Sequence, residues 1–189
     1  LGLEKGKYIL LSAHREENID TEKNFMSLFN AINKMAEKYD MPILYSCHPR
    51  SRNRLAASGF ELDSRVIQHE PLGFHDYNCL QMNAFAVVSD SGTLPEESSF
   101  FTSVGRSFPA VCIRTSTERP EAIDKGDFII AGIDEKSLLQ AVDTAVELCK
   151  DGLYGIPVPD YVDENVSTKV VKIVQSYVGI VNKIVWRKL

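Results

Sequence analysis

Residues 84–95 read Ala-Phe-Ala-Val-Val-Ser-Asp-Ser-Gly-Thr-Leu-Pro, and they combine a strand, a polar loop and the start of a helix. The first six residues are mostly apolar and have the length of a buried strand, whereas Pro95 suits the first turn of a helix. A strand that leads directly into a helix is the repeating unit of a parallel α/β sheet. This stretch therefore predicts an α/β fold, and we expect the same alternation along the rest of the chain.

The alternation extends in both directions from this stretch. Further strands are expected at residues 8–12, 42–47, 66–68, 110–113 and 128–131. Apolar residues at helical spacing predict helices at residues 25–39, 53–58, 77–82, 135–150 and 166–186. A stretch rich in Gly and Pro, residues 152–159, separates the last helix from the rest. The pattern predicts one Rossmann-like domain built on a doubly wound parallel sheet, with helices on both faces.

The composition is that of an ordinary globular domain. The chain has 189 residues, is 44% hydrophobic and 25% charged, and carries a formal net charge of −5. This acidic balance argues against a nucleic-acid-binding protein, which needs a basic face. No apolar run approaches the roughly 20 residues that span a bilayer, so no membrane partner is expected. Four scattered cysteines without a Cys-x-x-Cys pair favour reduced thiols and a cytoplasmic location. Because the sequence begins with Leu1 rather than Met, we expect a piece of a longer chain.

Arginines gather after the predicted strands. Six of them fall there: Arg15, Arg50, Arg52, Arg54, Arg114 and Arg119. Ligands of parallel sheets bind outside the carboxyl ends of the strands, and guanidinium groups pair bidentately with phosphate. The sequence therefore predicts an anion site at this edge. The alternative is that these charges are solvated and offset by nearby carboxylates of Glu16, Glu17, Glu118 and Glu121.

The loop at residues 89–97 is the most informative one. Ser91, Gly92 and Thr93 would offer amides and hydroxyls at a helix N-terminus, where phosphate is favoured, and Gly92 would allow close approach. Glu97 could accept hydrogen bonds from a ribose diol. The alternative is that Asp90 and Ser91 only cap the helix, while its first-turn glutamates complement the dipole. The loop matches neither a Walker A nor a Gly-x-Gly-x-x-Gly pattern.

A histidine, His14, directly follows the first strand. It is well placed as a general acid or base or as a donor to phosphate, although a lone loop histidine is often ordinary surface. His48, His69 and His75 lie after strands on the same edge, but their spacing fits no zinc motif. We therefore expect no metal.

Three motifs together resemble one family. They are Ser-Ala-His-Arg-Glu-Glu-Asn at 12–18, Ser-Asp-Ser-Gly-Thr at 89–93 followed by two glutamates, and Thr-Glu-Arg-Pro-Glu at 117–121. They occur in the order and spacing of the non-hydrolysing UDP-N-acetylglucosamine 2-epimerase family. The resemblance covers residues 8–149 and the second half of that family's chain. It implies that residues 1–189 are the C-terminal, nucleotide-holding domain of a two-domain glycosyltransferase-B arrangement. Residues 160–189 would form the closing helix that packs back across the hinge.

The resemblance also implies roles for single residues. His14 resembles the histidine that faces the diphosphate and the reacting sugar. Ser91 and Gly92 resemble the diphosphate cradle, with Thr93 standing where the family usually has glycine. Thr93 and the following glutamates and serines are closer to the branch that makes UDP-N-acetyl-L-fucosamine. The remaining implied ligand contacts are Glu97 at the ribose, Tyr77 (or its rival Phe74) at the uracil, and Arg15 and Arg119 at the diphosphate and the sugar phosphate.

The implied reaction inverts C2 of a UDP-N-acetylhexosamine through elimination and re-addition of UDP, without a cofactor, for surface polysaccharide precursors. The family's acid and base carboxylates lie on the first domain, so this chain alone is expected to be inactive. A homodimer is expected for the full-length protein. Two alternatives remain: the donor-binding domain of a glycosyltransferase-B enzyme, and a non-catalytic nucleotide-sugar sensor.

Overall fold

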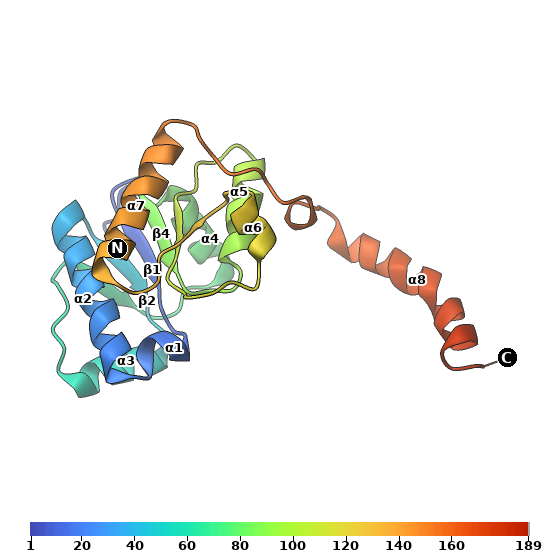
Figure 1. Cartoon of the computed structure of the whole chain (residues 1–189), viewed down its shortest axis with the longest axis horizontal. Helices are drawn as coiled ribbons and strands as arrows, with labels where there is room; N and C mark the ends of the chain where they lie inside the picture. The colour runs from blue at the N-terminus through green and yellow to red at the C-terminus, as the bar shows by residue number, and fades with distance from the viewer. Residues whose placement is uncertain (189) are drawn as a thin grey trace.

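A computed structural model describes residues 1–188 and confirms the predicted α/β fold (Figure 1). Six parallel strands form one sheet: β1 (Ile9–Ser12), β2 (Ile43–Ser46), β3 (Val66–His69), β4 (Ala86–Ser89), β5 (Ala110–Cys112) and β6 (Ile129–Ile130). The strand order is β3-β2-β1-β4-β5-β6. The direction of winding therefore reverses between β1 and β4, which pair from Ile9 with Ala86 to Ser12 with Ser89. Such a switch point is where parallel sheets bind ligands.

Helices cover both faces of the sheet. They are α1 (Glu16–Ile19), α2 (Glu22–Tyr39), α3 (Pro49–Ser58), α4 (Phe74–Asn83), α5 (Leu94–Ser103), α6 (Pro120–Asp124), α7 (Glu135–Lys150) and α8 (Val166–Ile184), with a 3-10 turn, η1 (Pro159–Tyr161). Alternate residues of a strand point to opposite faces. Accordingly, Ile9 and Leu11 pack in the larger core cluster, whereas Leu10 packs in a smaller one on the other face.

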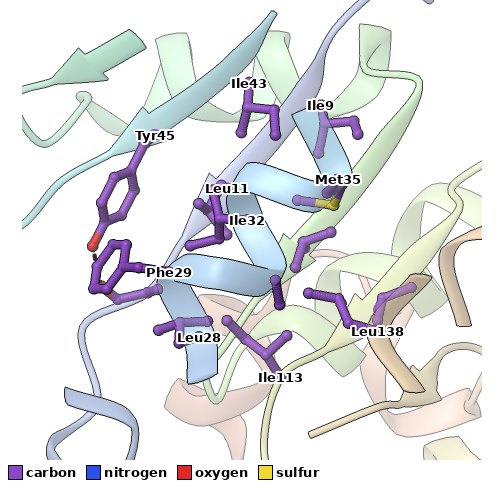
Figure 2. Packing of buried hydrophobic residues seen from close by; sticks show 14 of the residues in the cluster. Ile9, Leu11, Leu28, Phe29, Ile32, Met35, Ile43, Tyr45, Ile113 and Leu138 are labelled. Carbon is purple, nitrogen blue, oxygen red and sulfur yellow. Dashed lines mark hydrogen bonds between the residues drawn. The ribbon is translucent and has the colours of Figure 1, made fainter. Parts of the chain in front are cut away.

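The larger core cluster rests on α2. Its residues Leu28, Phe29, Ile32 and Met35 are fully buried at helical spacing and lie against strand residues of one sheet face (Figure 2). Burying such side chains contributes roughly 1.5–3 kcal/mol each. The packing holds β1 and β2 in place and so fixes the loop that follows β1.

Three segments differ from the sequence prediction. The loop expected after β1 contains a single helical turn, α1, and the segment at 120–124 forms another, α6. Helix α3 begins at Pro49 rather than at Asn53, because His48 accepts a hydrogen bond from the backbone amide of Arg50 and caps it. The arginines at 50, 52 and 54 therefore lie on a helix, not in a loop.

Helix α8 extends away from the sheet and its helices (Figure 1). None of its residues is buried by the part of the chain that the structure describes, and its apolar side chains, among them Val170, Val174 and Tyr177, are exposed. The predicted packing of this helix across a hinge therefore stays a prediction, and Leu189, the end of the predicted domain, lies outside the described residues. No helix within residues 1–188 is long and apolar enough to cross a bilayer.

One buried carboxyl is poorly accommodated and gives a stability prediction. Asp127 precedes β6, is almost fully buried beneath Gly155, and has no hydrogen-bond partner for either side-chain oxygen within residues 1–188. Burial raises the pKa of Asp127, against a smaller opposing effect of Ser99. We expect Asp127→Asn to stabilise the domain by about 1 kcal/mol at neutral pH, because it removes a buried charge.

Urea unfolding at several pH values would measure this effect. The raised pKa means that the contribution of Asp127 to stability is most favourable below the ordinary aspartate pKa and becomes less favourable as the pH rises through the raised value. The advantage of Asp127→Asn should therefore appear with rising pH and vanish in acid. A variant that is less stable than wild type at pH 7 would contradict the prediction.

Candidate functional site

Asp90 organises the switch point between β1 and β4. It directly follows β4, its side chain is fully buried, and its Oδ2 accepts hydrogen bonds from the backbone amides of His14 (2.9 Å) and Arg15 (2.8 Å). The same oxygen accepts from the side-chain amide of Asn18 at 3.1 Å, and Asn18 also donates to the carbonyl of Ile113. One carboxylate thus ties the loop after β1 to the loops after β4 and β5.

His14 is held beside this carboxylate. Its Nδ1 lies 3.1 Å from Asp90 Oδ1, an oxygen that has no other partner within residues 1–188. The hydrogen bond with Asp90 raises the pKa of His14, while partial burial and the charge of Arg15 oppose the increase. The His14 side chain remains partly exposed on the ligand-facing edge of the sheet. A histidine of raised pKa in this position can donate a hydrogen bond to an anion.

The Arg15 side chain extends from the loop after β1 to Gly92 in the loop after β4. Its Nε donates to the backbone carbonyl of Asp90 at 3.3 Å. A Cβ added to Gly92 would meet an Arg15 terminal nitrogen at 3.2 Å. Glycine at 92 therefore leaves the space that the guanidinium occupies, and the two predicted site residues lie together at the switch point.

Carboxylates pair with all five of the other clustered arginines. Ion pairs within 4 Å join Arg50 to Glu16 and Asp20, Arg52 to Glu70, Arg54 to Glu22, Arg114 to Glu17 and Glu118, and Arg119 to Glu96. Among residues 1–188, Arg15 is the one member of the six without such a pair. The charges of five arginines are thus offset, but only Arg50 and Arg114 pair with carboxylates that the sequence analysis named; the other three pair with Glu70, Glu22 and Glu96. Of these six arginines, Arg15 is therefore the one that an external anion could bind without displacing a carboxylate found in residues 1–188.

The loop before α5 does not cap this helix through a side chain in the described part of the structure. Thr93 occupies the N-cap position, and no side chain caps the helix amides. The predicted capping by Asp90 and Ser91 is therefore wrong: the Asp90 carboxylate binds the other loop, and the Ser91 hydroxyl accepts from the amide of Thr93 itself. The Thr93 hydroxyl instead donates to Glu97 Oε1 at 2.8 Å and lies 2.9 Å from the Ser91 hydroxyl. The structure brings Ser91, Thr93 and Glu97 into one polar cluster.

Two aromatic residues of α4 have different surroundings. Tyr77 is half-buried and packs against the small core cluster that contains Leu10. Burial raises the pKa of Tyr77 to about 12, the charge of Glu97 adds to the increase, and Ser89 and Ser12 oppose it. Phe74, by contrast, is 77% exposed. Of the two candidates for stacking on a base, Phe74 has the freer ring.

Arg119 lies at the start of α6, farther along the same edge. Its Nε and Nη2 donate to Glu96 Oε1 at 3.0 and 2.8 Å. This pair raises the pKa of Arg119 and holds its guanidinium against α5. A ligand that recruits Arg119 must therefore compete with Glu96.

Sequence reasoning overlooked two buried amides of the site, Asn18 and Gln81. Asn18 belongs to the motif at 12–18, but nothing in the sequence shows that its side chain reaches Asp90 and β5. Gln81 is buried on α4, where its Nε2 donates to Asn78 Oδ1 at 3.1 Å, and it lowers the pKa of Glu97 against the larger raising effect of burial. No group of three or more His, Cys, Asp or Glu within residues 1–188 is arranged to hold a metal ion.

The fold and this site define a Rossmann-like α/β domain with a polar site at its switch point. A family model described as UDP-N-acetylglucosamine 2-epimerase matches residues 2–175. The chain belongs to this UDP-N-acetylglucosamine 2-epimerase family.

Relatives and solved structures agree with this assignment. A UDP-N-acetylglucosamine 2-epimerase of Methanococcus maripaludis is 34% identical over 141 residues, which are 72% of this chain and 37% of the relative. The structure of a Rickettsia bellii UDP-N-acetylglucosamine 2-epimerase matches with a TM-score of 0.83 and 36% identity, over 98% of this chain and 48% of that one. A Methanocaldococcus jannaschii UDP-GlcNAc 2-epimerase in complex with UDP-GlcNAc and UDP matches with a TM-score of 0.77 and 27% identity, over 89% and 45%. The chain thus spans less than half the length of these proteins.

Proposed function

We propose that this chain is the UDP-holding domain of a UDP-N-acetylhexosamine 2-epimerase. The observation that carries the proposal is the Arg15 guanidinium, which lies against Gly92 and has no carboxylate partner within residues 1–188, beside a histidine of raised pKa at the switch point. Diphosphate is an anion that suits this pair of donors. The Methanocaldococcus relative bound to UDP-GlcNAc and UDP supports the choice of nucleotide.

The ligand would lie along the edge of the sheet. The diphosphate would contact Arg15, Gly92 and the Ser91 hydroxyl, and the ribose diol would donate to Glu97. The uracil would stack near α4 on Phe74 or Tyr77. Arg119 would reach the sugar phosphate after leaving Glu96. These assignments use the residues expected from the sequence, with Phe74 favoured at the base because of its exposure.

The reaction divides between this chain and the rest of the enzyme. A base removes the C2 proton while the C1–O bond to UDP breaks, which leaves a C1=C2 double bond and free UDP. UDP then adds back to C1, and a proton returns to the opposite face of C2. The groups of this chain stabilise the departing diphosphate, with His14 and Arg15 nearest to it. The carboxylate that takes the C2 proton would come from a first domain outside this sequence.

The remaining proposals concern the full-length protein. We propose that it joins a first domain of the same polypeptide, forms homodimers and supplies UDP-hexosamines for surface polysaccharides. The relation to the fucosamine branch, suggested by Thr93, stays a prediction.

The first test is calorimetry and turnover with the 189-residue chain. We expect it to bind UDP weakly and to show no epimerisation of UDP-N-acetylglucosamine, because the base is missing. Turnover by the chain alone would overturn the division of roles, and no binding of UDP would overturn the assignment of the site.

The full-length enzyme in D₂O separates the remaining functions. Epimerisation with deuterium entering at C2 is expected. Transfer of unlabelled sugar to an acceptor would instead indicate a glycosyltransferase, and tight binding without reaction would indicate a sensor.

A further inference from the structure

A chain of hydrogen bonds links the two ends of the loop before α5. The Thr93 hydroxyl donates to Glu97 Oε1 at 2.8 Å and lies 2.9 Å from Ser91 Oγ. The backbone amide of Thr93 donates to Ser91 Oγ at 3.3 Å. Thr93 therefore stands between the residue proposed for the diphosphate and the residue proposed for the ribose.

Each hydroxyl has a single proton, and this determines which group donates in each hydrogen bond. An ionised Glu97 can only accept, so the single proton of the Thr93 hydroxyl is directed to Glu97. Between the two hydroxyls, Ser91 must then be the donor and Thr93 the acceptor. Without a ligand, the Ser91 proton is directed to Thr93 and not outward. An incoming phosphate oxygen has to draw this proton away from Thr93.

Gln81 is a second residue that affects the pKa of Glu97. The Glu97 carboxyl is partly buried, and burial raises its pKa, while the hydrogen bond from Thr93 and the nearby Gln81 amide partly reverse that increase. Gln81 is almost fully buried on α4, and its Oε1 has no hydrogen-bond partner within residues 1–188. A buried, unsatisfied amide oxygen beside this carboxyl is costly unless a donor arrives there. Hydroxyl donors, such as those of a ribose, would meet this need.

We propose that Thr93 is a positioning residue in a nucleoside diphosphate site. Its hydroxyl donates to Glu97 and so holds the carboxylate in place for the ribose. The same hydroxyl accepts the proton of Ser91, which is then withheld from the diphosphate. This inference rests on the proposed function and goes beyond it. Thr93 would then act through Glu97 and Ser91, and not as a direct ligand contact.

The test compares Thr93→Val, which removes the hydroxyl at nearly constant shape, with Thr93→Ser, which keeps it. NMR titrations use uridine and inorganic pyrophosphate as separate probes. For Thr93→Val we expect uridine to bind about threefold to tenfold more weakly, as for the loss of one hydrogen bond. Pyrophosphate should bind equally well or more tightly, because Ser91 is free to donate. Thr93→Ser should behave as wild type, and so should Thr102→Val near the end of the same helix.

The ionisation of Glu97 in the ligand-free chain gives an independent readout. Carboxyl ¹³C titration should show a further increase in the pKa of Glu97 in Thr93→Val and no increase in Thr93→Ser, because the Thr93 hydrogen bond lowers it. Equal weakening of both probes with an unchanged Glu97 pKa would overturn the positioning role. If the wild-type chain binds neither probe, the proposed function fails, while the Glu97 titration still shows whether Thr93 positions the carboxylate.

Discussion

Asp90→Ala should destabilise the domain by about 2–4 kcal/mol and abolish measurable binding of UDP. The variant leaves three donors without their acceptor: the backbone amides of His14 and Arg15, and the side-chain amide of Asn18. The Asp90 side chain and Asn18 are buried, and the two backbone hydrogen bonds are partly buried, so water replaces the lost acceptor poorly. The loop that carries His14 and Arg15 would lose its anchor. Urea unfolding and calorimetric titration with UDP measure the two effects.

Asp90→Asn separates the charge of this residue from its shape. The carboxylate raises the pKa of His14, so the stabilisation from this pair is fully present below the ordinary histidine pKa of about 6.5 and is lost as the pH rises through the raised value. The difference in stability between wild type and Asp90→Asn should therefore narrow as the pH rises above about 6.5 and through the raised pKa of His14. A difference that stays constant over this range would show that His14 and Asp90 are not coupled.

Asp127→Asn is the matched control for both Asp90 variants. It changes another buried aspartate, but one whose oxygens have no hydrogen-bond partner in the described part of the chain. The two asparagine substitutions should therefore change stability in opposite directions at neutral pH. Destabilisation of similar size by both would mean that the Asp90 network has no special role.

Periodicity predicted long elements well and short ones poorly. Helix α7 spans Glu135–Lys150 as expected, because apolar residues recur along four turns and Asp134 caps the first of them. The single turns α1 and α6 were missed, since four or five residues cannot show a helical period. Their stability comes from tertiary contacts, which a local pattern does not contain.

The site was predictable to the extent that it depends on strand order. His14, Arg15 and the residues from Ser91 to Glu97 follow two strands that the fold places side by side, so their proximity could be expected. The hydrogen bond between Asp90 and the backbone of His14 could not be predicted, because the two residues are 76 positions apart in the chain. The pairing of five arginines depends in the same way on carboxylates from other segments. Sequence spacing therefore predicted which residues of the proposed anion site lie together, but not which arginine has no carboxylate partner among residues 1–188.

Arg15→Met should weaken UDP binding by about 10-fold to 100-fold, which corresponds to the loss of a charge-assisted hydrogen bond of about 1.5–3 kcal/mol. Methionine keeps the apolar stem of the side chain and removes the guanidinium. Stability should change little, because the Arg15 side chain makes one long hydrogen bond, to the Asp90 carbonyl, and no ion pair within residues 1–188. Calorimetric titration at low and at moderate salt would measure the loss, and the salt dependence of binding should fall with it.

Arg65→Met controls for the change in net charge. Arg65 precedes β3, at the opposite edge of the sheet, where it pairs with Asp40 and Asp63. Both variants remove one positive charge, but of the two only Arg15→Met should weaken binding of the diphosphate. The Arg15 guanidinium lies within contact distance of Gly92, and no carboxylate within residues 1–188 pairs with it. Arg15→Lys should recover part of the affinity, since an ammonium keeps the charge but cannot pair bidentately. Equal losses in Arg15→Met and Arg65→Met would show that UDP responds to the overall charge of the domain, and the switch point would then not be its binding site.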